Sequence, residues 1–229
     1  MTTHILCLAA ADPSLLMRAA RDARAALPQL RQVQVQRVLR HIPTDSVSPD
    51  QARAEIAPGA GAIGAVVACD FGSDPARMQA QAAPAWAGFL HAARAAGEPL
   101  FAFDAFTNVP IPPAGGAVRG GFRRWMLLRR AAPTQAAFRD AWFGRHADLV
   151  RHLPRVDGYL QHLVTSRHGA DGRPAGDESL PVDGIAELCY EDEAAMLASY
   201  ASPARLPLRD DGRALLGGIA TLLLQGEAA

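Results

Sequence analysis

The chain has 229 residues, enough for one large domain or two small ones. Hydrophobic residues make up 49% and charged residues 20%, proportions typical of a globular protein with a substantial core. The 23 basic and 23 acidic residues cancel, so no strong field attracts nucleic acid or an anionic membrane, and neither is expected as a partner.

Targeting segments and paired cysteines are both missing from the sequence. It shows no charged region followed by a secretory apolar run, and no stretch of about eighteen apolar residues. Cys7, Cys69 and Cys189 are isolated, without the paired spacing of a disulfide framework or a zinc site. We therefore expect a cytoplasmic protein with three buried thiols and no metal site.

The first half alternates apolar runs with alanine-rich helical stretches. Asp12 is a plausible cap for the first helix, and Asp74 precedes a proline at the first position of the second, which has a break before Pro84. The predicted order is β-α-β-β-α-β, with strands over residues 3–9, 32–41, 63–71 and 100–109 and helices over 13–26 and 75–96.

The same order returns after a proline- and glycine-rich stretch. The segment around Pro203 and Pro207 predicts no helix and leads to a last strand. The second set has strands over residues 122–130, 159–166, 184–190 and 219–225 and helices over 133–152 and 193–200.

Short matches between the halves support an internal repeat. Leu27-Pro28 ends the first helix as Leu153-Pro154 does in the second half, and residues 74–78 correspond to 192–196. The predicted organisation is a first repeat over residues 1–112, a linker over 113–121 and a second repeat over 122–229. Each βαββαβ unit leaves one sheet face bare. We therefore predict an α+β fold in which two tandem ferredoxin-like repeats pack as a pseudo-dimeric α/β barrel.

The helix of the second repeat carries the most informative residues. Phe138, Trp142, Leu149 and Leu153 share one helical face, and His146 lies one turn after Trp142 on that face. One interpretation makes His146 a partly buried histidine bonded to a carbonyl. The other places it at a cavity between helix and sheet, as an acid or base that titrates near neutrality.

Three ordered segments of this half resemble the EthD-like family of the dimeric α/β-barrel superfamily. They are Phe-x3-Trp-x3-His-Ala-x-Leu-Val-x2-Leu-Pro, then Gly-Tyr-x2-His, then Asp-Gly-Ile-Ala-Glu-Leu-x-Tyr, within residues 138–202. The resemblance implies a small-molecule cavity within the barrel, with the family histidine at His146 and its tryptophan at Trp142. Tyr159, His162 and Glu187 match the remaining motif positions.

The first half departs from this pattern. Ala20, Leu16 and Gln36 stand where the second half has His146, Trp142 and His162. We therefore expect one site, in the second repeat, and a structural role for the first.

Strand alternation limits which residues can share a cavity. Tyr159 and His162 point to opposite sheet faces, so His146 acts with one of them, not with both. Glu187 lies inside an apolar strand, either paired with an arginine such as Arg124 or Arg130, or unpaired with a raised pKa.

The predicted function is cofactor-independent chemistry on a small apolar carbonyl or phenolic compound in a barrel pocket. The candidate catalytic residues are His146, Tyr159 and His162, and the candidate substrate-binding residues are Trp142 and Glu187. The reaction would be lyase, isomerase or oxygenase-like. Alternatives are a non-catalytic binding protein of a degradation pathway and, by superfamily analogy, a haem-binding oxidoreductase. The expected partners are a small organic ligand and, beyond the internal pseudo-dimer, a second copy of the chain.

Overall fold

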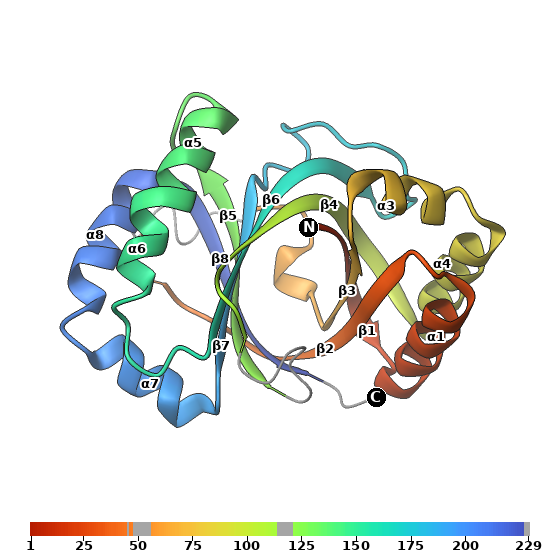
Figure 1. The fold of residues 1–229 in the computed structure, drawn as a ribbon, viewed down its shortest axis with the longest axis horizontal. Helices are drawn as coiled ribbons and strands as arrows, with labels where there is room; N and C mark the ends of the chain where they lie inside the picture. The colour runs from red at the N-terminus through yellow and green to blue at the C-terminus, as the bar shows by residue number, and fades with distance from the viewer. Residues whose placement is uncertain (45, 48–55, 114–120, 227–229) are drawn as a thin grey trace.

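The computed structural model describes residues 1–44, 46–47, 56–113 and 121–226. In these ranges eight strands form one sheet that closes into a barrel, with helices packed outside it on two opposite sides (Figure 1). The strands are β1 (Thr2–Ala11), β2 (Leu30–Ile42), β3 (Ala65–Phe71), β4 (Gly97–Ile111), β5 (Phe122–Arg130), β6 (Gly158–Gly169), β7 (Gly184–Tyr190) and β8 (Leu216–Gly226).

The helices follow the strands in the repeated order that the sequence predicts. The 3₁₀ turn η1 (Ala60–Ala62) precedes β3, and the π-helical turn η2 (Trp142–His146) joins α5 to α6. The α-helices are α1 (Pro13–Ala26), α3 (Asp74–Gln81), α4 (Pro84–Ala96), α5 (Gln135–Ala141), α6 (Ala147–Val150), α7 (Glu193–Ala201) and α8 (Arg205–Leu215). No helix in the described ranges has the length and apolar composition needed to cross a bilayer.

The strand order is β1-β3-β2-β8-β5-β7-β6-β4, and β4 pairs with β1 to complete the circle. The strands of each half are therefore contiguous, in the order 4-1-3-2 of a ferredoxin-like unit. Two antiparallel seams join the halves, β2 with β8 and β4 with β6. The predicted pseudo-dimeric α/β barrel of two tandem repeats is confirmed.

Helix termini follow local sequence signals. The Asp12 side chain caps α1 by accepting from the backbone N–H groups of Ser14 and Leu15, as predicted. Ser73, not Asp74, caps α3, and Asp74 lies in the first turn, where its charge suits the helix dipole. The predicted break before Pro84 separates α3 from α4.

Helix α8 is the main element that the sequence analysis missed. Pro203 and Pro207 led us to expect an irregular segment, yet residues 205–215 are helical. Pro207 lies in the first turn, where a missing N–H removes no intrahelical hydrogen bond.

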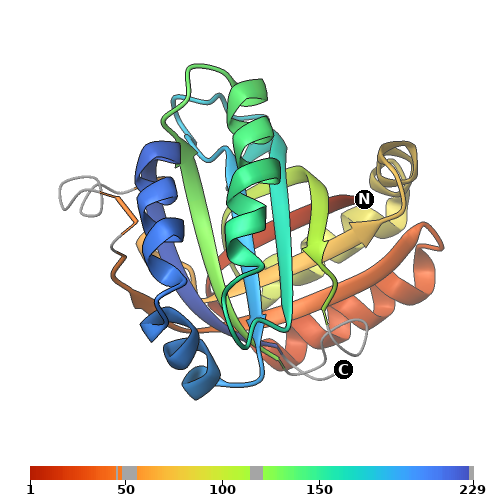
Figure 2. The same cartoon turned by 60° about the vertical axis from the view of Figure 1, so that its left-hand side comes forward.

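Three apolar clusters fill the molecule. One lies between the sheet and helices of the first half, and one between the sheet and helices of the second half. Figure 2 shows the helices of the second half lying across the outer face of their strands. The third lies inside the barrel and draws on both halves, with Ile5 and Phe103 from one and Trp125, Ile185 and Leu222 from the other. Strands β3 and β7 are buried at every position because both of their faces are covered.

The barrel interior is therefore packed with side chains. The prediction of a hollow inside the barrel beside His146 is wrong, because both cavities lined by histidines lie between helices and the outer face of the sheet. The boundaries of the two repeats stay a prediction. Of the predicted linker, residues 114–120 lie outside the described residues.

The shared interior predicts one cooperative unfolding transition for the chain. Phe103 is fully buried in the barrel, so Phe103→Ala should lower the free energy of unfolding by about 3–5 kcal/mol. Phe106→Ala is the control on the same strand, because that ring is 47% exposed, and it should cost about 1 kcal/mol or less. Urea unfolding followed by circular dichroism measures both. Two separate transitions, with only one shifted by Phe103→Ala, would contradict the shared core.

Candidate functional site

A continuous helical segment, α5–η2–α6, carries Trp142 and His146. Thr134 caps it by accepting from the backbone N–H of Ala137, and Phe138 and Trp142 anchor it with fully buried, stacked rings 5.1 Å apart. The π-helical turn holds an extra residue at the point where Trp142 and His146 face the sheet. Such turns are rare and occur often at functional sites.

His146 is held by a carboxylate from α8. Its Nδ1 lies 2.9 Å from Oδ2 of Asp211. The His146 side chain is 15% exposed and the Asp211 side chain 14%. The hydrogen bond from His146 lowers the pKa of Asp211, against the opposing effect of partial burial. An ionised Asp211 can only accept, so Nδ1 carries the hydrogen of this bond. Nε2 has no hydrogen-bond partner among the described residues.

Tyr159 lies on β6 and presents its hydroxyl to the same helix. The hydroxyl oxygen accepts from Nε1 of Trp142 at 3.2 Å and from Nε2 of Gln161 at 3.0 Å. Gln161 also donates to the backbone oxygen of Trp142 at 2.7 Å, which fixes the helix to the strand. Complete burial raises the pKa of the Tyr159 phenol well above its usual value, so the group stays protonated.

His146, Trp142 and Tyr159 line one pocket between the helices and the outer sheet face. Most of the remaining lining is apolar and comes from β5, β7, β8 and α8. The cavity measures about 40 Å³, room for one water-sized group. Among the apolar lining residues are Met126, Leu128, Leu188, Leu208 and Ile219.

His162 and Glu187 lie on the opposite sheet face, inside the barrel. Nδ1 of His162 lies 2.9 Å from the Thr107 hydroxyl, and its Nε2 is 3.8 Å from Glu187. Glu187 accepts from Arg123 at 2.5 Å, and Arg123 also donates to Gln34. The structure therefore brings His146, Trp142 and Tyr159 together but keeps His162 and Glu187 away from them.

The partner of Glu187 differs from both arginines named from the sequence. It is Arg123, whereas Arg124 lies over the Tyr200 ring and Arg130 pairs with Asp183. Burial would raise the pKa of Glu187, but the Arg123 charge and the nearby His162 outweigh it and lower that pKa. The alternative of an unpaired acid with a raised pKa is therefore wrong.

Sequence reasoning missed Asp211 and gave no role to Gln161. Asp211 was invisible because it lies on α8, which the prolines concealed. Gln161 shares the sheet face of Tyr159, and that alternation is the signal that could have identified it. No group of three or more metal-ligating side chains occurs in the described part of the chain.

A haem beside either pocket histidine would need much more room. The two histidine-lined cavities, of about 40 and 150 Å³, are below the roughly 300–1,000 Å³ typical of pockets for drug-sized ligands. The side chains present do not fit a porphyrin, and no step is assigned to one.

Comparison with known proteins agrees with the sequence motifs. Residues 131–216 match the family model of the EthD domain, and no curated protein matches the chain. The resemblance stated for the second half is confirmed.

Several solved structures share the fold over almost the whole chain. An anthrone oxidase-like protein superposes with a TM-score of 0.58 at 12% identity, covering 98% of this chain and 90% of that one. A putative monooxygenase from Lactobacillus acidophilus NCFM gives 0.58 at 10% identity, covering 99% and 95%. One from Fusobacterium nucleatum gives 0.61 at 7%, covering 99% and 94%.

The His146–Asp211 contact predicts a pH-dependent stability. Because the folded-state pKa of Asp211 is lowered, its contribution is present above the ordinary carboxyl pKa of about 4 and is lost as pH falls below it. Asp211→Asn should cost about 1 kcal/mol at pH 7 and almost nothing near pH 2. Urea unfolding across this range measures the difference. The control is Asp210→Asn, whose exposed pair with Arg209 should matter little at any pH; equal pH profiles for both variants would contradict the coupling.

Glu187 offers a test of whether its role is structural. Glu187→Gln leaves Arg123 buried without its charge partner, so the free energy of unfolding should fall by about 3–5 kcal/mol. Glu193→Gln, which breaks the exposed pair with Arg40, should cost less than about 1 kcal/mol. A Glu187→Gln variant of normal stability that loses ligand binding would instead support the substrate-binding role predicted from the sequence.

Proposed function

Residues 131–216 match the EthD domain. On this basis we propose that the protein is an enzyme that acts on a small organic molecule by acid–base chemistry at His146. The observation that carries the proposal is a histidine fixed by a carboxylate, with its other ring nitrogen available beside an apolar pocket. The chain supplies both halves of the barrel, so the pocket needs no second copy.

Asp211 sets the chemistry of the imidazole. Since the carboxylate accepts from Nδ1–H, the neutral ring carries its lone pair on Nε2 and can take a proton from a ligand. The imidazolium that forms is stabilised by the same carboxylate. A positioned acid–base group of this kind contributes roughly 10²–10⁴-fold to a rate. Asp211 acts as a positioning residue, since it reaches the ligand only through His146.

Tyr159 supplies the complementary donor. Its oxygen accepts from Trp142 and Gln161, which leaves its own hydrogen for an oxygen of the ligand. The raised pKa keeps that hydrogen in place. When His146 removes a proton next to a carbonyl or from a phenol, negative charge grows on the ligand oxygen, and a fixed donor stabilises it.

The mostly apolar lining favours an apolar compound with an oxygen function as the substrate. The closed pocket of about 40 Å³ admits the reacting group, and a ring requires the contact between η2 and α8 to open. Isomerisation, dehydration and decarboxylation need only these residues. Oxygenation of a phenolic or carbonyl compound would add molecular oxygen, in line with the names of the anthrone oxidase-like and putative monooxygenase fold relatives.

The second candidate is a non-catalytic binding or accessory protein that uses the same pocket. The small cavity favours it, since a storage or delivery protein needs shape and no proton transfer. His162 and Glu187 lie inside the barrel, away from this pocket, and stay predicted site residues.

His146→Ala separates these two functions. Phenols and small ketones are first screened by thermal shift on the unaltered protein, and turnover of each hit is followed by NMR. An enzyme should lose roughly 10²–10⁴-fold in kcat on His146→Ala, whereas a binding protein shows no turnover in either form. His152→Ala is the control, because this exposed histidine lies in the turn after α6 and bonds the Asp148 backbone oxygen. Unchanged binding and turnover in folded His146→Ala would end the proposal.

A further inference from the structure

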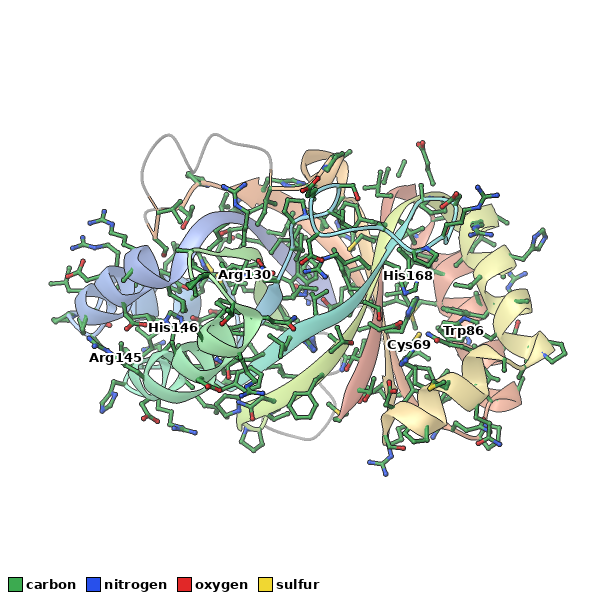
Figure 3. All side chains as sticks on the ribbon, turned by 90° about the horizontal axis from the view of Figure 1, so that it is seen from above. Cys69, Trp86, Arg130, Arg145, His146 and His168 are labelled. Atoms are coloured by element: carbon green, nitrogen blue, oxygen red, sulfur yellow. The ribbon has the colours of Figure 1, made fainter. Side chains whose placement is uncertain are left out.

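A second and larger cavity lies at the opposite end of the molecule from His146. It measures about 150 Å³ and lies between the outer sheet face of the first half and helices α3 and α4. In Figure 3, Trp86 and His168 lie at this end and His146 lies among the helices of the other. His168 belongs to β6, so both halves of the chain line the cavity. The lining is His4, Leu6, Gln81, Trp86, Leu90, Arg94, Pro99, Ala102, His168, Gly169, Ala170 and Gly172.

A buried carboxylate organises the polar side of this cavity. Oδ1 of Asp104 accepts from Nδ1 of His4 at 2.8 Å and from Gln81 at 3.2 Å. Oδ2 accepts from Arg77 and from Nε2 of His168, both at 3.0 Å. Burial would raise the pKa of Asp104, but the hydrogen bonds from His168 and His4 outweigh it and lower that pKa far below its usual value. Asp104 is therefore an ionised acceptor with four donors around it.

His4 is the group that this arrangement leaves incomplete. The residue is only 6% exposed, and its Nε2 is buried without a hydrogen-bond partner among the residues that the structure describes. Because Asp104 holds the hydrogen on Nδ1, Nε2 of the neutral ring is an acceptor. Buried polar atoms are rarely left unpaired, and this one belongs to a ring that lines an open cavity.

The other walls suit one aromatic ring. The Trp86 indole meets the His4 ring edge to face at 5.1 Å and 83°. Leu6, Leu90 and Ala102 complete an apolar surface beside it. A cavity of about 150 Å³ with apolar walls is large enough to hold benzene. The loop after β6 contributes Ala170 and Gly172 to this cavity.

We propose that this cavity is a second ligand site, which binds a single-ring phenol with its ring against Trp86. Nε2 of His4 has almost no accessible surface, so the His4 and Trp86 rings must shift on binding for the phenol hydroxyl to donate to it. The site is independent of the chemistry proposed for His146. It gives the first half, expected from its sequence to be structural, a binding role of its own.

Phenol itself is the probe, added to the full-length ¹⁵N-labelled protein at millimolar concentrations. The chain has three tryptophans, and the indole N–H signals of Trp86, Trp125 and Trp142 report separately on this cavity, the barrel interior and the His146 pocket. Phenol should shift the Trp86 signal with a saturable dependence and leave the Trp125 signal unchanged. Toluene, which has the same ring without a hydroxyl, should bind about tenfold more weakly.

Two variants test the residues. His4→Ala should weaken phenol about tenfold and remove its advantage over toluene. Leu90→Phe fills the cavity without touching the Asp104 cluster, so it should abolish binding of both compounds even where His4→Ala folds poorly. His91→Ala is the control, since this exposed histidine lies on α4 beside Leu90 and should leave binding unchanged.

Three results would overturn the proposal. The first is a Trp86 signal that phenol does not move in the unaltered protein. The second is equal affinity for phenol and toluene, which would leave no role for Nε2. The third is tighter binding of benzoate than of phenol, because the ligand would then be an anion attracted by Arg94.

Discussion

Closure of the sheet is the constraint on which the rest of the structure depends. The seams β2–β8 and β4–β6 give every strand two neighbours, so none of the eight is left with an unpaired edge. Closure also means that the two faces of the sheet pack against different partners. The inner face becomes a packed core shared by both halves and partly filled by η1, and the α-helices cover the outer face. The two histidine-lined cavities described above therefore lie between helix and sheet.

The β4–β6 seam also carries a chain of buried polar contacts. Thr107 on β4 lies opposite His162 on β6, and from there the contacts run through Glu187 to Arg123. A buried ion pair stabilises a fold little compared with apolar packing of the same volume, but its geometry is demanding. Shifting β6 by one residue would turn His162 toward the helices and leave Glu187 without this contact. The contacts are best explained as a device that fixes the register of the two halves.

The sequence predicted those features of the fold and of the site that depend on residues close together in the chain. Apolar runs located the strands, and the four-residue spacing of Trp142 and His146 placed both side chains at one pocket. The sequence did not predict contacts between side chains from elements far apart in the chain. Asp211 reaches His146 from a helix that two prolines concealed, and His4 meets Asp104 across 100 residues. The choice of Arg123 over Arg124 for Glu187 depends on strand register, which alternation alone leaves open by one residue.

The two outer cavities both lie between helices and the outer sheet face but are built differently. In the second half the imidazole comes from a helix and its carboxylate from another helix. In the first half the equivalent helical position is Ala20, and the imidazole and carboxylate come from paired strands, as His4 and Asp104. The first cavity is therefore no remnant of the second half's site. A packed barrel separates the two, so side-chain changes at one should act on the other only through overall stability.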